Sequence, residues 1–146
     1  MEPDEAVVAS SAGAMLEGDH ASRALGIEVL RASEGDAVAR MLLTEPMVNG
    51  HSMAHGGYVF LLADTAFACA CNSHGPVTVA ASAEVTFVAP AYEGDLLHAY
   101  AAERTRFGRS GIYDVTVRRG GEENDVVVAE FRGHSKILKR GEDARS

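Results

Sequence analysis

The sequence predicts an α+β protein in which a curved antiparallel sheet wraps around one long central helix. Residues 58–71 read YVFLLADTAFACAC and are apolar on every side except at Asp64 and Thr65, as in a buried helix. Two strand-like stretches precede this run and four follow it. A long sheet curled around a single helix would allow that helix to be apolar on most of its faces.

Length and composition favour a single domain. The 146 residues suffice for one domain with a proper core and are too few for two, and 47% of them are hydrophobic, which is ordinary for a globular protein. We expect one domain over 1–146, with its core at about 25–137, an N-terminal helix or tail at 1–24 and a flexible C-terminal tail at 138–146. The formal net charge of -8 argues against a nucleic-acid partner, because phosphates attract a basic surface.

The first part of the chain predicts a short helix and two strands. Residues 1–20 are small and polar, which favours a frayed end that runs into a short helix. Leu25–Ala32 and Asp36–Thr44 alternate roughly between apolar and polar side chains, as strands do. The turn residues Ser33-Glu34-Gly35 join the two strands.

The central helix is expected to span Gly56–Asn72. A loop or a turn of helix at 46–52 precedes it, and the residues from Asn72 to Pro76 are of the kinds that end helices. The rest of the chain is rich in Val, Thr and Phe, and turn signals at Glu93-Gly94-Asp95, Gly108 and Gly120-Gly121 divide it. The four strands predicted there are Val77–Val88, Leu96–Arg106, Ser110–Arg118 and Val126–Lys136.

The cysteines and the N-terminus indicate a cytoplasmic protein with no membrane partner. Cys69 and Cys71 lie at i and i+2 of the predicted helix and point away from each other, so a disulfide between them is not expected. Unpaired thiols suit a reducing compartment. The N-terminus is acidic, with Glu2, Asp4 and Glu5, unlike that of a signal peptide. The apolar helix is shorter than the ~20 residues that cross a bilayer.

Asp64 is the most informative residue of the chain. A carboxylate at the centre of a buried helix is costly unless it is used or satisfied, and such groups concentrate at active sites. The alternative is a structural acid satisfied by backbone donors, and burial alone does not separate the two. The helix also needs cover on the side away from the sheet. Because the chain has no second long helix, this predicts a partner subunit.

Several segments resemble one family of enzymes. They include Met47-Val48-Asn49-Gly50-His51, His55-Gly56-Gly57, the stretch from Leu62 to Ala68, and Cys71-Asn72-Ser73. These closely resemble the hotdog-fold acyl-CoA thioesterases, and in particular the phenylacetate-degradation (phenylacetyl-CoA) branch. The resemblance covers the chain from about Leu25 to Ile137. It implies a hotdog fold and a dimer with a continuous sheet, usually paired into a homotetramer.

The same resemblance implies a reaction. An acyl-CoA would be hydrolysed to a free acid and CoA, with no metal and no cofactor, since CoA is part of the substrate. An aromatic acyl-CoA such as phenylacetyl-CoA or hydroxyphenylacetyl-CoA is the expected substrate. Met53, Ala54 and Tyr58 differ from the residues expected in the nearest relatives, and they lie near the expected entrance for the acyl group.

Asp64 and Gly56 would carry the chemistry. Asp64 would either attack the thioester carbonyl or activate a water as general base, and the sequence leaves both routes open. Gly56 would polarise the carbonyl through its backbone N–H at the start of the helix, although a glycine pair also simply permits a tight turn. The two residues are eight positions apart, about 12 Å along a helix. Both must reach one carbonyl, so the site should join Gly56 of one subunit to Asp64 of another.

Three further residues match positions with roles in related thioesterases. Asn49, six residues before His55, would position the carbonyl or the attacking group, or would instead form a turn with Gly50. His55 would orient the helix mouth or the acyl group, and a histidine there is also a common cap. Ser82 would hold the water near the carboxylate, or would be an ordinary small strand residue.

Basic residues and histidines are the remaining candidates for ligand binding. The CoA phosphates would meet Arg106, Arg109, Arg132 and Lys136, although solvated strand ends would look the same in sequence. His51 and His55 are four apart, as in some metal sites. Glycines on both sides make a regular helix there doubtful and no third ligand is near, so no metal is predicted.

Two alternative functions remain open. One is a general medium- or long-chain acyl-CoA thioesterase on the same scaffold. The other is a non-catalytic acyl-CoA-binding sensor, although Asp64, Asn49 and Gly56 favour an enzyme, and a sensor that regulates transcription would need a DNA-binding segment for which the chain has no room. The sequence leaves open the acyl group, the role of Asp64 as nucleophile or base, and the pairing of dimers.

Overall fold

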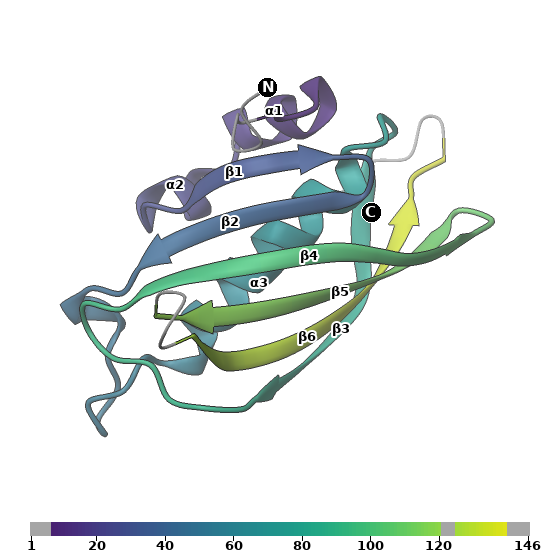
Figure 1. Ribbon diagram of the computed structural model, residues 1–146. Coiled ribbons are helices and arrows are strands. Elements are labelled where there is room, and N and C mark those ends of the chain that lie inside the picture. Colours follow the sequence, from purple (N-terminus) through teal and green to yellow (C-terminus); the bar gives the residue numbers. More distant parts are fainter. Residues whose placement is uncertain (1–6, 121–124, 140–146) are drawn as a thin grey trace.

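The computed structural model describes residues 7–120 and 125–139. In this part of the chain six strands form one antiparallel sheet in the order β1-β2-β4-β5-β6-β3 (Figure 1). The strands are β1 (Glu28–Ser33), β2 (Asp36–Leu42), β4 (Leu96–Phe107), β5 (Ser110–Arg119), β6 (Val126–Ile137) and β3 (Thr78–Phe87). The sheet curves around helix α3 (Gly56–Asn72), which confirms the architecture predicted from the sequence.

The boundaries of the elements differ from the predicted ones by a few residues. β1 begins at Glu28 rather than Leu25, because helix α2 (His20–Ala24) ends there and Gly26 turns the chain with a positive φ of 72°. The predicted loop before α3 contains a 3-10 turn, η1 (Glu45–Met47). Part of the predicted C-terminal tail, 140–146, and the second glycine of the predicted Gly120-Gly121 turn lie outside the described residues.

The N-terminal segment folds into two short helices, α1 (Ser10–Glu17) and α2, where one was expected. They pack on the side of α3 that the sheet leaves open. Ser11 Oγ donates to the carbonyl of Asn72, and Ser22 Oγ shares a hydrogen bond with Thr65 Oγ1. The chain therefore covers part of the far side of α3 itself, without a second long helix.

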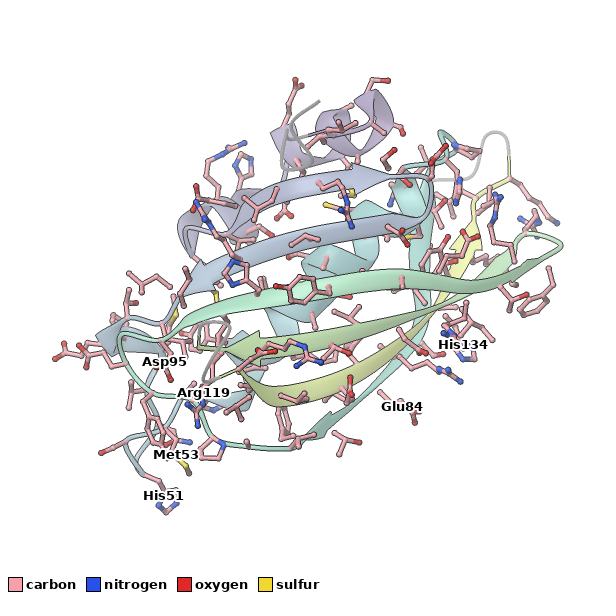
Figure 2. The ribbon with its side chains drawn as sticks, in the orientation of Figure 1. His51, Met53, Glu84, Asp95, Arg119 and His134 are labelled. Carbon is pink, nitrogen blue, oxygen red and sulfur yellow. The ribbon has the colours of Figure 1, made fainter. Side chains whose placement is uncertain are left out.

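The two edges of the sheet differ. The N-terminal segment is bonded to the outer edge of β1 at one point, where Ala32 exchanges backbone hydrogen bonds with Val7 and Ala9. β3 is the opposite edge, and most of its residues are exposed. Figure 2 shows Glu84 of β3 and His134 of β6 together at this side of the sheet, far from His51 and Met53 in the loop before α3.

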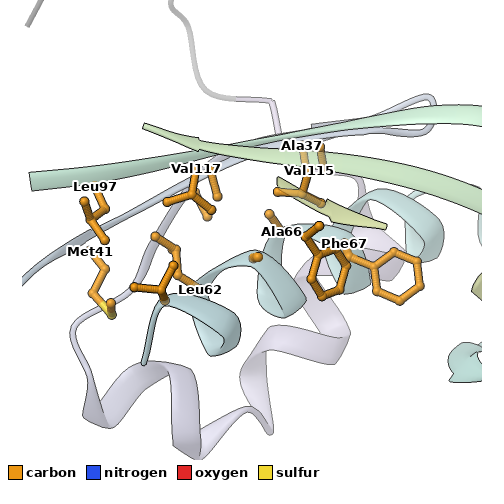
Figure 3. Close-up of a cluster of buried hydrophobic side chains, with 14 of the residues drawn as sticks. Ala37, Met41, Leu62, Ala66, Phe67, Leu97, Val115 and Val117 are labelled. Atoms are coloured by element: carbon orange, nitrogen blue, oxygen red, sulfur yellow. The ribbon is translucent and has the colours of Figure 1, made fainter. Parts of the chain in front are cut away.

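The core lies between the sheet and α3. Leu62, Ala66 and Phe67 of the helix pack beneath the inward-facing side chains of β2, β4 and β5 (Figure 3). Gly133 of β6 lets the helix approach the sheet, because a β-carbon at that position would lie 2.7–2.8 Å from three ring atoms of Phe67. Phe67 is only 1% exposed, so its ring has no room to move aside.

Candidate active site

The N-terminus of α3 presents an unused hydrogen-bond donor. His55 is the N-cap, and its Nδ1 accepts the backbone N–H of Gly57 at 3.0 Å. The Gly56 N–H, in contrast, donates to no atom of the described chain. The positive end of the helix dipole adds to this donor, so the position favours an oxygen that gains negative charge. In this structure the His55 ring acts as a cap.

An apolar cavity of about 410 Å³ lies directly beside Gly56. Its lining comprises Met53, Ala54, Gly56, Val59, Phe87, Val88, Ala89, Pro90, Ala91 and Val128. Phe87 packs closely over Gly56, because a β-carbon on Gly56 would lie 2.7 Å from Phe87 Cζ. The phenyl ring is itself 54% exposed. The glycine thus leaves space for an aromatic wall beside the free N–H.

Asp64 lies on the face of α3 that the chain leaves partly open. The partly or fully exposed residues Gly57, Leu61, Asp64 and Ala68 follow one another at helical spacing, whereas most other positions of the helix are buried. Burial raises the pKa of Asp64, and the negative charge of Asp19 raises it further. No side chain or backbone group of the described residues donates a hydrogen bond to the Asp64 carboxylate. A structural acid satisfied by backbone donors would not look like this.

Asn49 organises the loop before α3. Its Oδ1 accepts hydrogen bonds from the backbone N–H groups of His51, at 2.8 Å, and Met53, at 3.2 Å. Its backbone N–H donates to the Met53 carbonyl at 2.7 Å. The turn-forming alternative therefore accounts for the side-chain oxygen. The Nδ2 group donates to no atom of the described residues, so it is open to a substrate.

Ser82 lies on β3, directly opposite His134 of β6. Paired residues of an antiparallel ladder point to the same face of the sheet, and successive residues alternate. Gly133 faces Phe67 of α3, so His134 and Ser82 face away from α3 of their own chain. The structure therefore does not bring Ser82 to Asp64 within one chain, and its role in holding a water stays a prediction.

The structure also separates Gly56 from Asp64. Both belong to the regular helix α3, at its first residue and eight residues later. That spacing corresponds to about 12 Å along the axis. Within one chain the Gly56 N–H and the Asp64 carboxylate therefore cannot both reach one atom of a bound molecule.

The four predicted phosphate-binding cations do not form one group. Arg132 makes a bidentate ion pair with Asp114, with Nε–Oδ1 at 2.6 Å. Arg106 pairs with Glu103 at 3.3 Å, and Arg109 donates to the carbonyl of Ile137. Arg106 and Arg109 lie near Cys71 at the C-terminal end of α3, opposite the end that Gly56 occupies. The fourth, Lys136, is exposed on β6.

Two residues near the site escaped the sequence prediction. Phe87 lines the cavity beside Gly56, and Asp19 acts electrostatically on Asp64. Phe87 and Asp19 are both distant in sequence from the helix motif. For Asp19 the sequence showed only a helix N-cap pattern, an aspartate followed three residues later by Ser22. Cys69 and Cys71 are free and buried, and burial raises the pKa of each thiol to about 12.

Comparison with known proteins decides the family. Residues 51–126, just over half of the chain, match the model of the Thioesterase superfamily. The chain belongs to this superfamily. The Escherichia coli protein named acyl-coenzyme A thioesterase PaaI is 43% identical over 125 residues, which are 86% of this chain and 87% of the relative. The predicted thioester hydrolase is thereby confirmed.

Solved structures agree with this assignment. The structure of the E. coli PaaI protein from the phenylacetic acid degradation operon superposes with a TM-score of 0.84 at 42% identity, covering 89% of this chain and 92% of that one. A mutant of the phenylacetic acid degradation protein PaaI from Thermus thermophilus gives a TM-score of 0.75 at 34% identity, over 80% and 97%. The hotdog fold is confirmed.

Metal clusters and membrane-spanning helices are both absent from the described residues. Residues 7–120 and 125–139 contain no group of three or more His, Cys, Asp or Glu side chains placed to hold a metal ion. The same residues include no helix with the length and apolar character that crossing a membrane requires.

Proposed function

We propose that this thioesterase hydrolyses aromatic acyl-CoA thioesters such as phenylacetyl-CoA or hydroxyphenylacetyl-CoA. One observation carries the proposal. The unused Gly56 N–H opens beside an apolar cavity walled by the exposed ring of Phe87. A thioester carbonyl bound to this N–H would lay its acyl group in the cavity, where an aromatic ring finds an aromatic partner. The names of the E. coli and T. thermophilus relatives support the same substrate class.

The reaction needs a hydrogen-bond donor that polarises the thioester carbonyl and a carboxylate that acts as nucleophile or base. The Gly56 N–H and the helix dipole stabilise the negative charge that develops on the carbonyl oxygen. Asp64 either attacks the carbonyl carbon, expelling CoA thiolate and leaving an anhydride that water hydrolyses, or takes a proton from the water that attacks. Both routes release the free acid and CoA. Burial favours them, because a carboxylate with a raised pKa is a stronger base and nucleophile.

The site is completed by a second copy of the chain. The edge strand β3 is mostly exposed, and the face of α3 that carries Asp64 is only partly covered by its own chain. Pairing of β3 with the β3 of a second copy would extend the sheet across the dimer and bring Asp64 toward Gly56 of its partner. We propose that two such dimers pair into a homotetramer.

Remaining features of the site follow from the substrate. Asn49 Nδ2 would help to hold the carbonyl, and Ser82 would hold the attacking water only if another copy of the chain brings its Asp64 to the outer face of β3. Arg106, Arg109, Arg132 and Lys136 are the proposed contacts for the CoA phosphates. No metal or cofactor takes part in this proposal. Two buried free thiols suit a reducing compartment, so we place the enzyme in the cytoplasm.

The first test compares two acyl-CoA substrates, and it compares the replacement of Asp64 with that of a control acid. Wild type should hydrolyse phenylacetyl-CoA faster than a straight-chain acyl-CoA, and Asp64→Asn should lose about 10²–10⁴-fold in kcat while remaining folded. Asp36→Asn, the same change at an exposed acid of β2, is the matched control and should keep its activity. A wild type that binds these thioesters without turnover would replace the enzyme by an acyl-CoA sensor. Preference for long straight chains would favour the general thioesterase.

Phe87 tests whether the cavity holds the acyl group. Phe87→Ala should reduce kcat/KM for phenylacetyl-CoA more than for a short aliphatic acyl-CoA. Phe107→Ala removes an equally exposed ring, 55% against 54%, at the opposite end of the sheet and should affect the two substrates alike. Equal losses for both substrates in Phe87→Ala would assign the cavity to the pantetheine arm instead.

The backbone donor is tested with proline. Gly56 is the first helical residue, where proline is well tolerated, and His55 before it is extended (φ -65°, ψ 133°), as a residue preceding proline must be. Gly56→Pro removes the N–H, whereas Gly56→Ala keeps it and makes the same contact with Phe87. Proline should therefore lose about 10²–10³-fold in kcat and alanine much less. Similar losses in both would assign the effect to crowding.

Mixing the two inactive variants tests the shared site. Hybrid dimers of Gly56→Pro and Asp64→Asn hold one intact site if each site joins Gly56 of one subunit to Asp64 of the other. Random mixing makes half of the dimers hybrid, so about a quarter of wild-type activity should return after refolding together. No recovery from subunits that demonstrably exchange would place both residues of a site in one chain.

A further inference from the structure

A hydrogen-bond chain links helix α2 to the catalytic turn of α3. Ser22 Oγ donates to Asp19 Oδ2 at 2.6 Å, and the Ser22 N–H donates to Asp19 Oδ1 at 3.0 Å. Ser22 Oγ and Thr65 Oγ1 are 2.8 Å apart, and both side chains are buried. Because the only hydroxyl proton of Ser22 goes to Asp19, Thr65 must be the donor to Ser22. The chain therefore runs in one direction, from Thr65 through Ser22 to the carboxylate.

The Thr65 end of these hydrogen bonds lies next to the proposed catalytic carboxylate, Asp64. Thr65 directly follows Asp64, and its hydroxyl is the point at which the N-terminal segment grips the middle of α3. Ser22 and Thr65 are only 4% and 5% exposed, so water does not compete for these bonds. Asp19 brings a second negative charge near Asp64 and near Cys69.

Within residues 7–120 and 125–139, few other charges act on this part of α3. On the helix itself Cys69 and Cys71 are thiols whose raised pKa keeps them neutral. Tyr113 of β5 and Glu103 of β4 are hydrogen-bonded to each other near Cys71, at the C-terminal end of the helix. Glu17 of α1 and His20 and Arg23 of α2 are exposed. Charged residues of the sheet are exposed or paired with one another, among them Glu28, Arg31, Asp36, Arg40, Glu84, Glu130, Arg132, His134 and Lys136.

We propose that Asp19 is a positioning residue for the reaction, which holds Thr65 through Ser22 and keeps a second negative charge beside Asp64. This inference rests on the proposed function, in which Asp64 acts on the thioester. The hydrogen bonds fix the turn of α3 that carries Asp64, and the like charge favours a more basic carboxylate there. The N-terminal helices are thus part of the working site as well as cover for α3.

Three substitutions separate the two effects. Asp19→Asn removes the charge and leaves one side-chain oxygen where Ser22 now finds two, and asparagine remains a good N-cap, so the fold should persist. Ser22→Ala breaks the link to Thr65 but leaves the charge of Asp19 in place. Glu17→Gln changes the charge by the same amount two residues earlier, on an exposed side chain, and is the control.

The carboxyl group of Asp64 should be titrated by NMR in each folded variant, with Asp64→Asn to assign the signal. Asp19→Asn should lower the pKa of Asp64, and the acid limb of kcat/KM for phenylacetyl-CoA should move to lower pH with it. Ser22→Ala should lower kcat by up to about 100-fold, through misplacement of Asp64, with a smaller movement of the limb. Glu17→Gln should match wild type in both measurements.

The outcomes distinguish this inference from the proposed function. An Asp64 titration that Asp19→Asn moves no more than Glu17→Gln does, or a kcat that Ser22→Ala leaves unchanged, would overturn the role of Asp19. A wild type without thioesterase activity would contradict the proposed function. The NMR titration would still show whether Asp19 changes the pKa of Asp64. If Asp19→Asn does not fold, Asp19→Ser replaces it in the experiment, because serine keeps an N-cap without charge. Asp19→Ser must then lower the pKa of Asp64 as well.

Discussion

The substitution Gly133→Ala measures how closely α3 must approach the sheet. The added methyl would lie 2.7–2.8 Å from three atoms of the Phe67 ring, which is 1% exposed and packed against Tyr113 and Phe131 at centroid distances of 5.6 and 5.7 Å. Gly133 has no positive φ, so alanine brings no backbone strain. The whole cost is therefore overpacking, about 1–3 kcal/mol of unfolding free energy.

Gly56→Ala is the matched control for that value. Its methyl would also lie 2.7 Å from a phenylalanine ring, but Phe87 is 54% exposed and can swing aside. The stability of Gly56→Ala should therefore stay within about 1 kcal/mol of wild type. Thermal melting at one fixed protein concentration should show a fall of roughly 2–4 °C per kcal/mol for Gly133→Ala. Equal melting temperatures for the two variants would refute the reasoning that neighbour mobility decides the cost.

Three further predictions concern the charge of Asp64, the two thiols and the hydrogen bond of Tyr113. The raised pKa of Asp64 makes its ionisation unfavourable to folding, so Asp64→Asn should melt higher than wild type at neutral pH and equally in acid, below the pKa of both states. Cys69 and Cys71 should resist a thiol reagent at pH 8 until the protein is denatured. Tyr113→Phe should cost about 0.5–1.5 kcal/mol in urea unfolding, because it removes the hydrogen bond to Glu103.

Each of these has a contrary result. An Asp64→Asn protein less stable than wild type at neutral pH would mean that the carboxylate is satisfied by a partner. Rapid modification of the native thiols would show that the C-terminal half of α3 opens readily. An unchanged urea midpoint in Tyr113→Phe would mean that water replaces the phenol as a partner of Glu103.

Local pattern was sufficient for the central helix and for most of the strands. The apolar run of α3 and the stop residues from Asn72 to Pro76 define that helix without reference to the rest of the chain. The turn at Gly35, with φ of 87°, separates β1 from β2 as its sequence predicts. The N-terminal helices were harder to predict, because they are short and their stability comes from contacts with α3 rather than from their own periodicity.

The sequence by itself determined the curved sheet around one apolar helix, the position of Asp64 within that helix and of Gly56 at its start, because periodicity, glycine and turn residues act over a few neighbouring positions. Only the tertiary structure decided that Phe87 walls the cavity beside Gly56, that Ser82 faces away from Asp64, and that Asp19 reaches Thr65 through Ser22. The hydrogen bond between Ser22 and Thr65, for example, joins residues 43 positions apart. They depend on strand order and register, which side-chain packing over the whole domain sets and no local pattern contains.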